Sequence, residues 1–172
     1  VELDFHELDI VPNSSVTGRP VERAWIIVAI DHFSRMVVGF FLTLKPPHAA
    51  AVVECLRHAV LPKNETLTRF PDLQSEYPCA GYMRLVTTDN DTATWADVVE
   101  QACDQLKIPF RYCPGEMPEM KAYIERFFNT LTHSCIQTAA GSTFSNPAER
   151  GDYDSDANAA YDIVMLTERI AT

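Results

Sequence analysis

Apolar residues near the start of the chain are arranged as in β-strands. Residues 25–31 and 36–44 are rich in β-branched and aromatic side chains and are separated by the short segment 32–35, so they predict a hairpin. Residues 1–12 alternate imperfectly between apolar and polar positions before Pro12, and they predict an earlier strand. The first 44 residues therefore predict an antiparallel meander of three strands.

The apolar spacing changes to three and four residues after Pro46. Over residues 48–61 it places Ala51, Val52, Cys55, Leu56 and Ala59 on one side, which predicts an amphipathic helix that closes at Pro62. Residues 62–82 show no periodicity, and we expect an insertion there.

Strand and helix patterns alternate in the second half of the chain. Residues 84–88 and 108–113 predict short strands on either side of a helix over 94–106. The apolar face expected for that helix is formed by Trp95, Val98, Val99, Ala102 and Leu106. A strand–helix–strand order implies parallel pairing through a helical crossover. Two further helices are predicted, over 117–131 and from about 156 to 170.

This order of elements predicts an α/β domain of the ribonuclease H-like class. Its mixed five-stranded sheet would have three antiparallel strands followed by two parallel strands, flanked by helices. A chain of 172 residues with 47% hydrophobic residues suffices for one domain with its own core, spanning residues 1–172. The chain lacks an initiator Met and has a candidate site residue near its start, so we expect a fragment of a longer protein.

Charge argues at first against a nucleic-acid-binding protein. The chain has 14 basic and 24 acidic residues and a formal net charge of −10, whereas contacts to phosphates need Lys and Arg. The objection weakens if part of the acidity forms a metal site and if other domains hold most of the DNA. Five scattered cysteines without a Cys-x-x-Cys pair indicate neither a zinc module nor a disulfide framework, which favours a reducing cytoplasm. The absence of a long apolar run argues against a membrane partner.

Three carboxylates on separate predicted elements suggest a shared metal site. Asp4 lies in the first strand, Asp89 follows the strand at 84–88, and Glu125 lies in the helix over 117–131. Thirty-five residues separate Asp89 from Glu125. Functional groups gather at the carboxyl ends of strands in parallel sheets, and Mg²⁺ prefers oxygen ligands. Two such ions would support an in-line phosphoryl displacement without a Ser, Cys or His nucleophile.

Ordinary structural roles compete with this interpretation. Acidic residues at strand ends commonly form turns, and three other aspartates are rival ligands by the same argument: Asp9, Asp31 and Asp91. Glu125 follows Lys121 by four residues on the predicted helix, so the two could also form a surface ion pair.

Four segments together resemble the catalytic core of DDE-type transposases and retroviral integrases, and above all the large transposase subunit of Mu-like and heteromeric bacterial transposons. They are ELDFHELD at 2–9, AIDHFSRMVVGF at 29–40, TTDN at 87–90 and KAYIERFFNTL at 121–131. The segments 141–147 and 151–154 resemble the loop that follows the catalytic helix in the bacterial branch. Two departures are Asp91 and Ala122, which stand where a Gly is common.

The resemblance implies roles for individual residues. Asp4, rather than Asp9, would be the first catalytic and metal-binding carboxylate, with Asp89 and Glu125 as the others. The ligand set would hold Mg²⁺, with two ions and with Mn²⁺ as a substitute. Lys121 and Arg126, which flank Glu125, would contact DNA phosphates, with a structural ion pair as the alternative role of Arg126. Asp31 would be structural, in a turn closed by Ser34 and Arg35.

The implied activity is metal-dependent cleavage at transposon ends to leave a 3′-hydroxyl, followed by strand transfer of that end into target DNA. Transposon-end and target DNA would be the partners, the protein would act as a homo-multimer on DNA, and an ATPase or target-selection protein could assist it. Two alternatives stay open: a ribonuclease H-like nuclease or resolvase without strand transfer, and a catalytically inactive DNA-assembly module.

Overall fold

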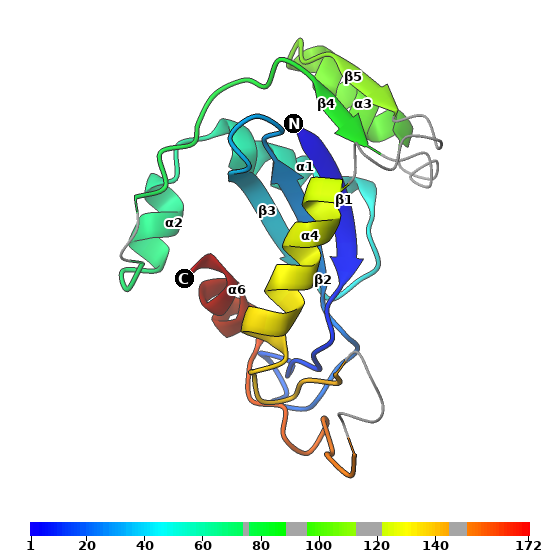
Figure 1. Ribbon diagram of the computed structural model, residues 1–172, viewed down its shortest axis with the longest axis vertical. Coiled ribbons are helices and arrows are strands. Elements are labelled where there is room, and N and C mark those ends of the chain that lie inside the picture. Colours follow the sequence, from blue (N-terminus) through cyan, green and yellow to red (C-terminus); the bar gives the residue numbers. More distant parts are fainter. Residues whose placement is uncertain (74–75, 89–95, 113–121, 145–150) are drawn as a thin grey trace.

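A computed structural model shows the architecture of the chain (Figure 1). It describes residues 1–73, 76–88, 96–112, 122–144 and 151–172. Within these residues no helix combines the length and the apolar character needed to cross a bilayer.

One five-stranded sheet with the strand order β3-β2-β1-β4-β5 forms the centre of the fold. The strands are β1 (Glu2–Glu7), β2 (Trp25–Ile30), β3 (Val37–Thr43), β4 (Val86–Thr88) and β5 (Phe110–Tyr112). The β1–β2 and β2–β3 pairs are antiparallel, and the β1–β4 and β4–β5 pairs are parallel. The mixed sheet predicted from the sequence is confirmed, and β1 is its central strand.

Helices cover both faces of this sheet (Figure 1). The helices α1 (Ala49–Val60) and α3 (Ala96–Gln105) share one hydrophobic cluster with the inward side chains of β1 and β2, including Leu3 and Ile27. The helices α4 (Ala122–Leu131) and α6 (Ile163–Ala171) share a second cluster with the opposite face. Strand residues point alternately to the two faces, so the continuous apolar run of β2 serves both clusters.

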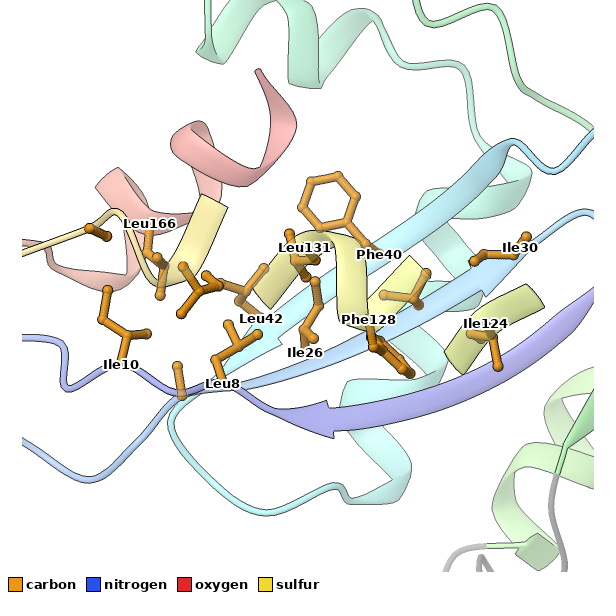
Figure 2. Close-up of a cluster of buried hydrophobic side chains, with 14 residues drawn as sticks. Leu8, Ile10, Ile26, Ile30, Phe40, Leu42, Ile124, Phe128, Leu131 and Leu166 are labelled. Atoms are coloured by element: carbon orange, nitrogen blue, oxygen red, sulfur yellow. The ribbon is translucent and has the colours of Figure 1, made fainter. Parts of the chain in front are cut away.

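The second cluster fixes the position of α4 (Figure 2). Ile124, Phe128 and Leu131 lie one helical turn apart and are buried against the sheet. Leu8 and Ile26 are among the fully buried side chains opposite them. This spacing of three and four residues is the reason why the segment forms an amphipathic helix.

The regions around α4 and the chain end differ from the sequence prediction. Residues 132–136, which lie beyond the helix predicted over 117–131, continue α4 as a π-helix (Thr132–Ile136) that buries Ile136. The last helix begins at Ile163 instead of near residue 156, because the Asp162 carboxylate accepts hydrogen bonds from the backbone N–H groups of Val164 and Met165, both at 2.9 Å.

Two predictions for the middle of the chain were wrong in detail. The aperiodic stretch 62–82 contains a short helix, α2 (Asn64–Arg69), which buries none of its residues and so leaves no apolar period to detect. In α3 the buried side chains are Val99 and Cys103, which are four residues apart, whereas Val98 is 48% exposed. Val98 lies about 100° around the helix from Val99, and the sequence alone did not reveal which of the two faced the sheet.

Helix α1 approaches β3 closely at Gly39. A Cβ atom at this position would lie 2.7 Å from the carbonyl oxygen of Cys55 and 2.8 Å from both the backbone nitrogen and the Cβ of Ala59. Two of these three atoms belong to the helix backbone, so no rotation of a side chain could relieve the overlap.

The outer edge of β3 is protected by side chains. The Phe40 backbone N–H donates to Nδ1 of His58 at 3.1 Å, and the Tyr77 hydroxyl donates to the carbonyl of Val37 at 2.7 Å. The other ring nitrogen of His58 lies 3.0 Å from Oγ1 of Thr66. Burial, followed by the charges of Lys63 and Arg57, lowers the pKa of His58 to about 4. A neutral His58 thus satisfies a strand-edge amide that could otherwise pair with another chain.

We predict that Gly39→Ala destabilises the protein by about 1–3 kcal/mol, because α1 must move away from β3 to admit one methyl group. Chemical denaturation measures the change. Ala50→Ser, which adds one atom at an exposed position of the same helix, is the control and should stay within about 0.5 kcal/mol of the wild type. Equal stability of Gly39→Ala and the control would contradict the close approach.

We also predict that stability decreases as the pH falls from about 6.5 towards 4. In this range His58 becomes protonated in the unfolded chain. In the folded state it stays largely neutral, because its pKa is lowered to about 4. Between pH 7 and pH 5 the free energy of unfolding should decrease by about 1 kcal/mol more in the wild type than in His58→Gln, after allowance for solvent screening. His133→Gln, at an exposed position, should keep the wild-type slope. The same slope in His58→Gln would exclude His58 as its cause.

Candidate functional site

Asp4 lies in the middle of the central strand, on the face covered by α4. It stands opposite Val28 of β2, which belongs to the same hydrophobic cluster as the buried residues of α4. Two residues later, the ring of His6 stacks on Phe128 of α4 at 5.0 Å between centroids. Because alternate strand residues share a face, Asp4 and His6 both point towards α4. Oδ1 of Asp4 accepts a hydrogen bond from the Phe5 backbone N–H at 2.8 Å.

Glu125 lies in the first turn of α4, next to the buried Ile124. Its side chain is exposed, and it makes no hydrogen bond or ion pair with the residues that the structure describes. Helix α4 contacts β1 and runs in the same direction (Figure 1).

The contact between His6 and Phe128 sets the relative level of the two carboxylates. Asp4 precedes His6 by two strand residues, or about 7 Å, and Glu125 precedes Phe128 by three helical residues, or about 4.5 Å. Both therefore lie on the same side of that contact. The structure brings Asp4 and Glu125, which are 121 positions apart in the sequence, to the same region of one sheet face.

Asp89 and Lys121, the other predicted site residues of this region, lie outside the described residues. What the structure does show is the strand that leads to Asp89: Thr88 is the last residue of β4, and Thr87 is paired with Glu2 of β1. Among the described residues, no group of three His, Cys, Asp or Glu side chains could hold a metal ion. The triad of Asp4, Asp89 and Glu125 therefore stays a prediction.

Two of the rival carboxylates have structural partners. Asp9 lies 3.3 Å from the Arg23 guanidinium, which also contacts Glu7 at 3.5 Å. Asp31 accepts hydrogen bonds from the backbone N–H and the hydroxyl of Ser34, at 2.8 and 2.7 Å, and these two bonds lower the pKa of Asp31. The third rival, Asp91, lies outside the described residues. The prediction that Asp31 closes a turn is confirmed.

Arg126, predicted to contact DNA, follows Glu125 on α4 and is exposed. Its guanidinium makes no ion pair within the described part of the chain. Arg23, in contrast, is paired with Asp9 and Glu7.

The turn between β2 and β3 packs on the first turn of α4, a contact that the sequence analysis missed. Cζ of Arg35 lies 3.1 Å from the ring centroid of Tyr123, and the ring of His32 meets the same ring edge-on at 5.1 Å. Arg35 has a φ of 65°, which only a few per cent of residues other than Gly adopt. No periodicity in the sequence signals such a contact between a turn and a distant helix.

We predict that Asp31→Ala destabilises the protein by about 1 kcal/mol, because both Ser34 donors lose their acceptor. Asp31→Asn keeps a carbonyl oxygen at the same position and should lose less than half as much, and the exposed Asp72→Ala should change little. Thermal unfolding measures all three. If Asp31→Asn is as destabilised as Asp31→Ala, the carboxylate charge has a role beyond closing the turn.

Comparison with known proteins finds two similar proteins of transposons. It is 26% identical over 139 residues to the transposase for transposon Tn552 of Staphylococcus aureus, covering 81% of this chain and 26% of the relative. It is 22% identical over 171 residues to the transposon Tn7 transposition protein TnsB of Escherichia coli, covering 97% of this chain and 24% of the relative. The chain therefore spans about a quarter of the length of these relatives.

A solved structure supports the fold. A chain of the simian T-cell lymphotropic virus intasome, determined in complex with the PP2A regulatory subunit B56 gamma, superposes with a TM-score of 0.53 at 15% sequence identity. The match covers 98% of this chain and 45% of that one. Residues 2–141, which include β1, α4 and every candidate site residue, match the model of the TnsB C-terminal domain. This protein therefore belongs to the TnsB C-terminal domain family.

Proposed function

We propose that this chain is the catalytic core of a DNA transposase, with a ribonuclease H-like fold, that cuts transposon ends and joins them to target DNA. The observation that carries the proposal is that Asp4 and Glu125 lie on one face of the sheet and on the same side of the His6–Phe128 contact. The family supports it, since the similar proteins are a transposase and a transposition protein.

Asp89 is the third member of the site in this proposal. Val86 belongs to the cluster on the α1 side, so its neighbour Thr87 points to the α4 face, where Glu2 of β1 is its partner. Asp89 comes two residues after Thr87, and Asp4 comes two residues after Glu2. A parallel pair that kept this register would turn both aspartates to the α4 face, beside each other.

The donor set fits a hard divalent cation. Asp4, Asp89 and Glu125 offer only oxygen ligands, as Mg²⁺ requires, and Mn²⁺ accepts the same ligands. Two bound ions would supply Lewis-acid activation of the attacking oxygen and stabilisation of the leaving oxygen. The chain itself contributes a rigid frame, because Asp4 lies in the central strand and Glu125 is fixed by the buried Ile124 and Phe128.

The proposed reaction has two phosphoryl-transfer steps, a hydrolysis followed by a transesterification. In the first, water attacks the phosphorus at a transposon end and the 3′ oxygen leaves as a hydroxyl group. In the second, that 3′-hydroxyl attacks a phosphodiester of target DNA, whose own 3′ oxygen leaves. The second step replaces one phosphodiester by another, so it needs no external energy source and is reversible in principle.

Basic side chains beside the carboxylates would hold the phosphates. Arg126 is exposed and has no ion-pair partner among the described residues, and Lys121 precedes Glu125 by four positions. Because the relatives are about four times longer, we propose that most DNA affinity comes from other parts of the protein, which explains how a chain with a net charge of −10 can act on DNA. Multimers on DNA and an ATPase or target-selection partner belong to the same proposal.

We predict that Glu125→Gln lowers the joining of 3′-hydroxyl DNA ends to a plasmid by more than about 100-fold, which exceeds the usual effect of indirect changes at metal sites. The unfolding midpoint should not change, because Glu125 is exposed. Glu22→Gln, another exposed carboxylate, should join normally. Joining by Glu125→Gln at the wild-type rate would refute the assignment. Metal-dependent cutting without joining by the wild type would favour the nuclease alternative, and the absence of both would favour the inactive module.

A crystal soaked in Mn²⁺ tests the ligands directly. The anomalous difference map should show a peak between Asp4 and Asp89, within reach of Glu125. A peak at Asp9 or Asp31 instead would mean that the proposed ligands are wrong, even if the protein cuts and joins DNA.

A further inference from the structure

Phe33, at the tip of the β2–β3 hairpin, is the most exposed large apolar side chain in the described residues, with 96% of its surface accessible. Single apolar residues on a surface are common and need no special role. The next most exposed one is Val16, at 91%. Phe33 differs from Val16 because the turn that carries it is held rigidly and packs on α4.

Four hydrogen bonds and a ring contact hold this turn. Ser34 donates twice to the Asp31 carboxylate, the Arg35 N–H donates to the Asp31 carbonyl at 2.9 Å, and the Asp31 N–H donates to the Met36 carbonyl at 2.9 Å. Arg35 then lies against the ring of Tyr123 on α4. Phe33 is therefore presented from a fixed backbone, so a ligand that stacks on it need not order a flexible loop.

The turn lies beside the proposed catalytic site. Tyr123 and Glu125 flank the buried Ile124, each about 100° from it around the helix, so they lie on opposite sides of α4. Tyr123 faces the side of the hairpin, so Glu125 lies on the side of α4 away from the hairpin. The two sides are separated by the width of one helix, about 10 Å. Two or three stacked nucleotides, at about 3.4 Å each, span this distance.

Charge near Phe33 favours nucleic acid as the occupant. The exposed His32 and Arg35 flank it on the turn, and the exposed Arg126 lies on the adjacent helix, although the chain as a whole has a net charge of −10. An arginine stacked on an aromatic ring keeps N–H donors at its edge that can bind a phosphate.

We propose that Phe33 stacks on a base of the reacting DNA strand, two or three nucleotides from the phosphodiester that is exchanged, while Arg35 contacts the neighbouring phosphate. This inference rests on the proposed function. Stacking on an aromatic side chain tolerates any base, since every base has a π face, so Phe33 positions the strand without selecting a sequence.

The test uses a three-way branched DNA of arbitrary sequence, which has the form of a joined product. 2-Aminopurine is placed in turn at each of the first five nucleotides from the junction, in Mg²⁺ buffer. The wild-type protein should change the fluorescence most strongly at the second or third nucleotide. Phe33→Tyr, which keeps an aromatic ring, should also change it there, and Phe33→Ala should lose the change and bind about 5- to 100-fold more weakly. Val16→Ala, at a similarly exposed position, is the matched control and should behave as the wild type.

Salt dependence separates stacking from phosphate contacts. Phe33→Ala should weaken binding with an unchanged slope of log affinity against log salt, whereas Arg35→Ala should make the slope shallower by about one phosphate contact. Resolution of the branch, the reverse of joining, is followed on the same DNA. If the wild type resolves the branch and Phe33→Ala gives the same fluorescence change and affinity as the wild type, the stacking role is refuted and the proposed function stands. If the wild type neither joins ends nor resolves the branch, both are refuted.

Discussion

The packing of α4 on the central strands is the contact on which the rest of the structure depends. Ile124, Phe128 and Leu131 are buried against the face formed by β1 and β2, and each such side chain contributes about 1.5–3 kcal/mol through removal of apolar surface from water (Figure 2). The same contact fixes the rotation of the helix about its axis. Because Ile124 must face the sheet, Glu125 is turned to one side and Tyr123 to the other.

The rotation of α4 thus links the proposed carboxylate site and the hairpin. On one side, the Glu125 carboxylate shares a sheet face with Asp4 of β1; on the other, Tyr123 receives Arg35 and thereby fixes the hairpin that displays Phe33. A change that rotated α4 would therefore disturb the carboxylates and the hairpin together. Rigid elements are well suited to phosphoryl transfer, in which positioning and charge account for most of the catalysis.

Several polar groups elsewhere on the surface have structural partners within the chain. The edge of β3 is closed by His58 and Tyr77, and Asp9 and Asp31 have partners in Arg23 and Ser34. Glu125 and Arg126, in contrast, are exposed and have no ion pair within the described residues. Glu125 lies on the helix that covers the sheet face to which Asp4 points.

The sequence alone determined the elements whose apolar period is strong: the three antiparallel strands, α1, and the α4 segment with its buried stripe. It also singled out Asp4 and Glu125 and the turn closed by Asp31, because motif and chain order carry those features. Only the tertiary structure decided which side of α3 faces the sheet, where α6 begins, and that α2 exists, since exposed or capped ends leave no period in the sequence. It alone brought Arg35 onto Tyr123, because such long-range contacts depend on how whole elements pack and not on local sequence.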